Sequence, residues 1–262
     1  MFRLLAIVFL LLSLNFDRAA ASSYTTDMSD WWWNPSESGW GVNISQQNDV
    51  LGVAFFVFDS NQKPVWYTAA LNYQSSQSFV WSGDLYATQG PWFGGAYNSA
   101  AVTRTKVGTA TFTALQINSA TLQYSINGVS VTKQIQRITF KNENLSGNYI
   151  GGFSIKFSGC SNPAYEGLVD NEVGVMPVTH SGSTVTVTVP LSAGYTCTFT
   201  GQYSQTGKLG QISGSYSCTD GTSGTFSAVE VTPTISGFTS RVSGQNQVCK
   251  WSGSLGAITR AQ

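Results

Sequence analysis

The sequence predicts an all-β protein made of two antiparallel β domains, each a sandwich or a barrel. Three observations support this prediction. No window of the chain shows convincing helical periodicity. Turn residues recur every 8 to 12 positions, a spacing typical of sandwiches and barrels. Ser, Thr, Gly, Val, Tyr and Phe dominate the chain, and of these Val, Tyr, Phe and Thr favour strands.

The N-terminal segment has the features of a signal peptide. Arg3 supplies a positive charge, residues 4–14 are an apolar run, and residues 19–21 are three alanines suited to cleavage. The apolar run is too short to cross a bilayer, and no other stretch approaches that length. We therefore expect residues 1–21 to be removed and the mature protein to be secreted or periplasmic.

The charge of the mature chain is close to neutral. Removal of residues 1–21 leaves 11 basic and 12 acidic residues, and only 10% of the whole chain is charged. Such a chain has no electrostatic footprint for nucleic acid or for an anionic membrane. We expect neither as a partner, and the sequence gives no indication of oligomeric state.

The polar segment 141–144 divides the chain into a Trp-rich domain, 24–141, and a domain with all four cysteines, 145–262. In the first domain we expect strands near 40–46, 50–58, 64–73, 79–87, 101–116, 120–126 and 129–139. In the second we expect strands near 147–156, 173–179, 183–190, 195–204, 209–218, 223–231, 235–243 and 247–255. Residues 50–58 are apolar at both odd and even positions, which predicts a strand covered on both faces.

One hairpin of the first domain can be derived in register. Asn127-Gly128 is a strong signal for a type I′ turn, in which both central residues have positive φ. Closure there pairs Ile126 with Val129 and continues to Ala120 with Ile135. One face of this ribbon is then apolar except for Lys133 and the other is polar, so the ribbon should cover a core.

A second hairpin predicts a disulfide. A turn at Gly207-Lys208 places Cys197 opposite Cys218, where Cβ atoms approach bridging distance. Cys160–Cys249 would then join the start of the domain to its end. Four cysteines allow three connectivities, so this pairing is a preference. Short connections predict an up-and-down meander closing into a barrel. No spacing suits zinc, and we predict no metal site and no cofactor.

Residues 32–41, with the sequence WWNPSESGWG, resemble the opening motif of a family of secreted bacterial proteins. Residues 64–67, 82–86, 107–110 and the Asn127-Gly128 hairpin also match, and together the matches extend over most of residues 31–140. Residues 214–218 and 220–226 are similar to a companion domain found with it. The family has no established activity, so the resemblance implies secretion and a bacterial source without a mechanism. The second half is also similar in layout to avidin-like or lipocalin-like barrels.

The tryptophans are the main functional lead, because seven of the eight lie in the first 92 residues. Indole faces stack on sugars, and nearby amides and carboxylates hydrogen-bond the hydroxyls. The simpler interpretation is that these rings form a core and its rim. In an extended run, Trp31 and Trp33 face one way and Trp32 the other. The candidate ligand-binding residues are Trp32, Trp33, Asn34, Glu37, Trp40, Trp66 and Asp84.

Catalysis finds little support in the sequence. His180 is the sole histidine and ends a predicted strand, and no serine lies in a nucleophile-elbow motif. A carboxylate pair such as Glu37 with Asp84 occurs in many β proteins. Glu37 is better explained as a loop carboxylate that accepts hydrogen bonds from backbone N–H groups. We therefore predict a protein that is not an enzyme.

Three hypotheses for function follow. The first is a non-catalytic binding module whose Trp-rich domain takes a glycan or another cell-surface partner. The second is a structural or interaction protein with buried tryptophans and an exposed apolar patch or open sheet edge. The third is capture of a small molecule inside the second domain, in a cavity lined by Tyr195, Phe199, Tyr203 and Tyr216.

Overall fold

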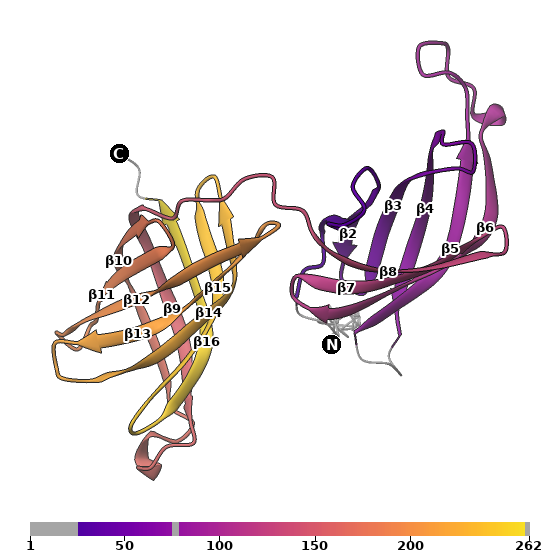
Figure 1. Cartoon of the computed structure of the whole chain (residues 1–262). Helices are drawn as coiled ribbons and strands as arrows, with labels where there is room; N and C mark the ends of the chain where they lie inside the picture. The colour runs from indigo at the N-terminus through magenta and orange to yellow at the C-terminus, as the bar shows by residue number, and fades with distance from the viewer. Residues whose placement is uncertain (1–25, 75–78, 260–262) are drawn as a thin grey trace, which may run out of the picture.

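The structure is a computed structural model that describes residues 26–74 and 79–259. Within them, sixteen strands form two closed antiparallel barrels of eight strands each (Figure 1). Each strand pairs with its neighbours along the chain, so both barrels are up-and-down meanders. The all-β prediction with two antiparallel domains is therefore confirmed. The predicted signal peptide, residues 1–21, lies outside the described residues.

The first barrel follows the predicted strands closely and adds one at its start. Its strands are Asp30–Trp33 (β1), Gly41–Gln47 (β2), Val50–Phe58 (β3), Pro64–Tyr73 (β4), Val80–Gln89 (β5), Thr103–Gln116 (β6), Ser119–Ile126 (β7) and Val129–Arg137 (β8). The short 3-10 helix η1, Ser99–Ala101, precedes β6. Sequence reasoning missed β1, although β1 closes the barrel by pairing Trp32 with Arg137 and Trp33 with Gln136 of β8.

The second barrel begins after a connecting segment, residues 138–146. Its strands are Gly147–Ser158 (β9), Val169–Ser181 (β10), Thr184–Pro190 (β11), Thr196–Thr206 (β12), Leu209–Cys218 (β13), Ser223–Thr234 (β14), Gly237–Asn246 (β15) and Lys250–Thr259 (β16). The 3-10 helix η2, Pro163–Tyr165, lies in the β9–β10 connection. Ten residue pairs join β16 to β9 and close this barrel.

Large aromatic rings fill the interior of the first barrel. Trp32, Trp81 and Phe112 are fully buried, and Phe112 makes edge contacts with both indoles at centroid distances of 5.3 and 6.0 Å. The predicted β7–β8 hairpin is confirmed in every pair, and Asn127 and Gly128 have φ of 49° and 84°, as a type I′ turn requires.

The prediction that residues 50–58 are covered on both faces is wrong. Leu51, Val53 and Phe55 point into the barrel and are buried, whereas Phe56 and Phe58 point outward and are exposed. A closed barrel places only one side of each strand in its core, and in the described residues no second layer covers the other side of β3. The apolar outward residues of β3 therefore form a surface.

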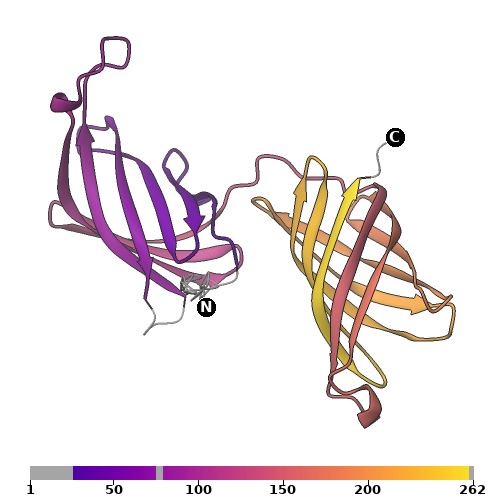
Figure 2. The same cartoon turned by 180° about the vertical axis from the view of Figure 1, so that it is seen from behind.

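Two disulfides hold the end of the second barrel that lies away from the first barrel. Cys197 of β12 is paired with Cys218 of β13, and Cys160 is paired with Cys249, as the sequence predicted. Figures 1 and 2 show this end, which carries η2, pointing away from the first barrel. Among the described residues, no helix has the length and apolar character needed to cross a membrane.

The opposite end of the second barrel is closed by the connecting segment. The Leu145 side chain is buried there, and its backbone N–H donates to His180 Nδ1 at 3.1 Å. The Tyr149 hydroxyl donates to the Leu145 carbonyl at 3.0 Å, and the Tyr149 ring packs against Phe238. The predicted boundary at residues 141–144 falls within this connecting segment.

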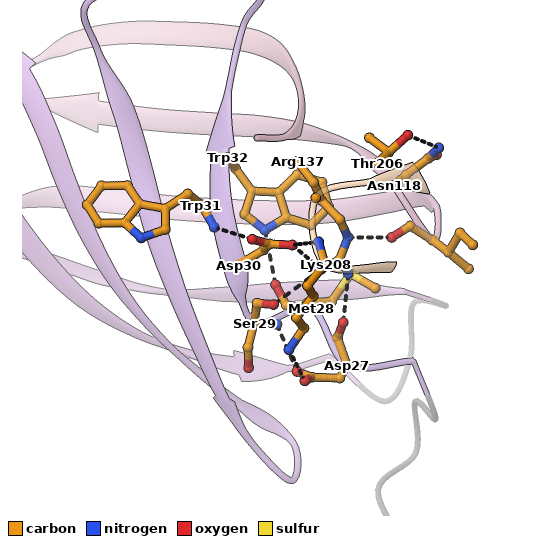
Figure 3. A network of polar contacts seen from close by, with 12 residues as sticks. Asp27, Met28, Ser29, Asp30, Trp31, Trp32, Asn118, Arg137, Thr206 and Lys208 are labelled. Carbon is orange, nitrogen blue, oxygen red and sulfur yellow. Dashed lines mark hydrogen bonds and ion pairs between the residues drawn. The ribbon is translucent and has the colours of Figure 1, made fainter. Parts of the chain in front are cut away.

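A buried ion pair at the end of the first barrel, between Arg137 and Asp30, meets a hairpin of the second barrel. Arg137, at the end of β8, donates from Nε to the Ile117 carbonyl at 2.7 Å and from Nη1 to Asp30 Oδ2 at 3.2 Å. The same Asp30 oxygen accepts the backbone N–H of Lys208, at the tip of the β12–β13 hairpin, at 3.0 Å. Figure 3 shows Arg137 beside Trp32 and Asp30, with Trp31 pointing away. We call Asp27, Asp30, Arg137, Gly207 and Lys208 the clasp.

The tip of the β12–β13 hairpin can approach Asp30 and Arg137 closely because a glycine stands there. Gly207 has φ of +63°, and a Cβ atom there would lie 2.4 Å from Asp30 Oδ2 and 2.5 Å from Arg137 Cβ. Lys208 Nζ also binds Asp27 Oδ2 at 2.5 Å. Burial raises the pKa of Asp27, but hydrogen bonds from Lys208 and Ser29 outweigh it, so this pKa lies below its usual value.

Candidate functional site: the cavity of the second barrel

The second barrel encloses a cavity of about 410 Å³. Its deep part is bounded by residues from the middle of the strands, such as Ala228, and from the barrel end that the connecting segment closes, such as Phe238. Its outer part reaches the disulfide end, where Tyr165 of η2, Thr222 and Asn246 line it. The cavity therefore extends along the barrel interior toward the end that lies away from the first barrel.

The cavity wall is mostly aromatic and aliphatic. Phe199 stacks on Tyr216 at 5.0 Å, and its edge contacts Phe226 at 5.3 Å. Tyr216 also makes an edge contact with Trp251 of β16 at 6.1 Å. These rings come from four strands and contact one another around the wall, so the cavity is a preformed apolar site rather than a gap between mobile loops.

The period-two pattern of the strands explains why these rings point inward. Phe199 and Tyr216 are paired across β12 and β13, the same pairing that the sequence predicted for the cysteine hairpin. Both disulfides contribute to the wall near the opening, through Cys197, Cys218 and Cys249. The covalent links therefore hold the outer part of the cavity in shape.

Three of the four rings expected from the sequence line this cavity, and one does not. Tyr195, Phe199 and Tyr216 are part of the wall. Tyr203 instead lies at the linker end, where its ring contacts His180 at 5.0 Å and its hydroxyl donates to Gln205. Burial, with a smaller contribution from the charge of Glu143, raises the pKa of Tyr203 to about 12. Tyr203 thus belongs to the closure of the barrel.

Asp170, near the start of β10, is the single charged side chain on the cavity wall in the described part of the chain. Burial, followed by the negative charge of Glu172, raises the pKa of Asp170. Glu172 is buried and accepts hydrogen bonds from the Ser192 hydroxyl at 2.7 Å and the Ser192 N–H at 3.0 Å. Sequence reasoning missed Asp170, although it shares the inward parity of Met176 and Val178.

The residues predicted to bind ligand in the first barrel are separated by the fold. Trp32 is in the core, donates its indole N–H to the Met28 carbonyl at 3.0 Å, and has no surface for a ligand. Asn34 folds its own loop by accepting from the Ser36 N–H and hydroxyl. Trp33 is half-buried, with the outward parity of Trp31.

Glu37 and Trp40 form a second small group in the β1–β2 loop. Glu37 accepts from Lys133 Nζ at 2.7 Å and from the Trp40 indole N–H at 3.1 Å. The hydrogen bond from Lys133 holds the pKa of Glu37 below its usual value. Glu37 thus accepts hydrogen bonds from side chains, where the sequence led us to expect backbone donors.

The outward rings of the first barrel form an aromatic strip, which we define as Trp31, Phe56, Phe58 and Trp66. Phe56 pairs with Trp66 across β3 and β4, and Trp31 stacks on Phe56 at 5.4 Å. The exposed fractions of Trp31, Phe56 and Trp66 are 39%, 44% and 52%. Asp84 lies on the outward side of β5 and is paired with Lys106 at 2.7 Å.

A second pocket of about 610 Å³ is lined largely by glycine and polar residues of the second barrel, together with Asp27, so it offers a ligand less apolar surface than the cavity. Within residues 26–74 and 79–259, no three His, Cys, Asp or Glu side chains lie together as metal ligands.

Comparison with known proteins returned no matching family model, no curated relative and no similar solved structure.

Proposed function

We propose that the protein is an exported, non-catalytic binding protein that captures a small, largely apolar molecule in the cavity of its second barrel. One observation supports this most strongly: the interior of the second barrel is hollow and ring-lined. Its volume, about 410 Å³, falls within the range of ligand pockets, which is roughly 300–1,000 Å³.

The construction of the site supports capture rather than chemistry. The wall offers ring faces and aliphatic groups, so transfer of an apolar molecule from water into the cavity is favourable. The disulfides at one end of the barrel and the connecting segment that closes the other end support a preformed cavity, which lowers the entropic cost of binding. The two disulfides also favour export, because such bonds persist in oxidising compartments.

The test is a titration of the full mature chain with N-phenyl-1-naphthylamine, a neutral probe whose fluorescence rises in apolar surroundings. We expect saturable binding of one probe per chain. Ala228→Phe places a ring in the cavity from β14 and should abolish this binding. The matched control, Ala70→Phe on the exposed side of β4, should bind as the unaltered protein does. Equal binding by both variants would contradict the proposal.

A second candidate function is glycan binding at the aromatic strip. The observation that favours it is the exposure of Trp31 and Trp66 beside Phe56 on one sheet face, since ring faces stack on sugars. The double variant Trp31→Ala/Trp66→Ala should lose binding to soluble cello- or chito-oligosaccharides. Trp92→Ala, which alters an exposed indole in the β5–β6 loop, is the control. Oligosaccharide affinity that is unchanged in the double variant would remove this candidate.

A further inference from the structure

We propose that the cavity selects molecules that carry an ammonium group on an apolar body, with the ammonium held between Asp170 and the rings near the opening. This inference rests on the proposed function, because it names the class of ligand for the same cavity.

The charge on the cavity wall has one sign. Asp170 is the only charged group among the wall residues in the described segments, and no Lys, Arg or His accompanies it. One further carboxylate acts on this group: after burial, the negative charge of Glu172 raises the pKa of Asp170. The local potential therefore favours a cation and opposes an anion.

The neighbouring rings suit the same kind of ligand. Tyr165, Tyr195, Tyr216 and Trp251 all line the cavity, and Tyr216 and Trp251 meet at 68°. Rings at such an angle present faces in different directions around one space. A cation within about 6 Å of a ring face is attracted by the ring quadrupole, and the attraction is stronger where water is excluded.

Glu172 and Asp170 have different roles in this arrangement. The carboxylate of Glu172 accepts two hydrogen bonds from Ser192, which fix the β11–β12 connection beside the opening. Asp170 lies on the wall itself, where its carboxylate can donate no proton when ionised and can only accept. An ammonium group supplies the donors and the opposite charge together, whereas an alcohol supplies only a donor.

The experiment compares three probes with the same apolar body: 4-phenylbutylamine, 4-phenylbutanol and 4-phenylbutyrate. Calorimetric titrations of the full mature chain at pH 7.5 should give an affinity for the amine about tenfold above that for the alcohol, with the carboxylate weakest. Asp170→Asn should reduce the affinity for the amine to about that for the alcohol. The affinity for the alcohol should not change.

Asp220→Asn is the matched control. It removes the same charge from the same end of the barrel, but Asp220 lies in the β13–β14 turn, where it accepts from Thr222, and is not on the cavity wall. We expect the preference for the amine to survive in this variant. Loss of the preference in Asp220→Asn to the same extent as in Asp170→Asn would overturn the assignment to Asp170.

The outcomes separate the inference from the proposed function. If the alcohol and the carboxylate bind as tightly as the amine, the cavity binds apolar molecules and the inference is wrong. If none of the three probes binds, the proposed function fails and the inference fails with it. A preference for the amine that depends on Asp170 alone supports both.

Discussion

The two barrels share strand number, direction and order, but differ in what fills them. In the first barrel, Trp32, Trp81 and Phe112 meet edge to face in the centre and are fully buried. In the second barrel, Phe199 and Tyr216 line a cavity of about 410 Å³. Topology therefore does not determine whether an eight-stranded barrel is solid or hollow. The side chains at inward positions determine it.

The stabilising interactions differ in the same way. A filled barrel gains from burial of its rings, whereas a hollow one forfeits the contacts that would fill its centre. The second barrel has two covalent links at its open end and a plug at its closed end. We infer that disulfides replace part of the packing in the second barrel, and that this leaves room for a ligand.

The largest expected effect comes from Cys160→Ser/Cys249→Ser. These residues are 89 positions apart, and their disulfide joins the β9–β10 connection to the β15–β16 connection. Loss of a loop closure of that length should lower the free energy of unfolding of the second barrel by about 4–5 kcal/mol. Amide hydrogen exchange, measured at increasing denaturant concentration, should show a loss of protection in β9–β16 alone. Equal loss of protection in β1–β8 would contradict the division between the barrels.

A matched pair of ring deletions compares the two interiors. Phe112→Ala, in the filled barrel, should cost about 4 kcal/mol because both neighbouring indoles lose contacts. Phe199→Ala, on the cavity wall, should cost about 2 kcal/mol because one side of that ring already faces open space. Urea unfolding of both variants measures the difference. Equal costs would mean that the second interior is packed as tightly as the first.

The clasp determines how the barrels are held together, and Gly207→Ala tests it. The added methyl would overlap Asp30 and Arg137, so the hairpin tip should leave the first barrel while both barrels stay folded. Small-angle X-ray scattering should report a larger radius of gyration. Gly221→Ala, in a turn where a Cβ meets nothing within 4 Å, controls for strain at a positive φ. An unchanged radius in Gly207→Ala would show that the clasp does not hold the barrels.

The smallest expected effect is a pH dependence of amine binding. Burial, followed by the charge of Glu172 on the same strand, raises the pKa of Asp170, and the charge of Asp170 is in turn among the causes that raise the pKa of Tyr195, after burial. Since the pKa of Asp170 is raised, protonation should begin above the ordinary Asp range, and affinity for 4-phenylbutylamine should fall as pH falls through that raised pKa. Calorimetry from pH 7.5 to 4.5 measures it. In Asp170→Asn the affinity for 4-phenylbutylamine should not change with pH. A similar decline in this variant would mean that a group other than Asp170 causes the effect.

Local features of the fold could be predicted from the sequence, whereas features that depend on several distant strands could not. The Asn127-Gly128 turn and the pairing of Cys197 with Cys218 follow from residues close in the chain, and both were predicted. The outward exposure of Phe56 depends on whether anything covers the barrel, which alternation within β3 does not reveal.

The candidate site was predicted only in part for the same reason. Tyr195, Phe199 and Tyr216 could be placed inside a barrel from their parity, but the empty volume depends on all the inward side chains together. The Arg137 network joins segments more than one hundred residues apart, such as Asp30 and Arg137, and no local pattern marks it. Asp170 precedes the strand predicted near 173–179, so the parity that it shares with Met176 and Val178 becomes visible only in β10, which begins at Val169.

The most direct test of the account is a titration of 4-phenylbutanol followed on the indole N–H signals by ¹H–¹⁵N NMR. Trp251 is the sole tryptophan of the second barrel and lines its cavity, while the other seven lie in the first 92 residues. We predict that the Trp251 signal, assigned with Trp251→Phe, moves and saturates while the others stay in place. Movement of the Trp31 or Trp66 signal with Trp251 unchanged would place binding on the aromatic strip and contradict the account.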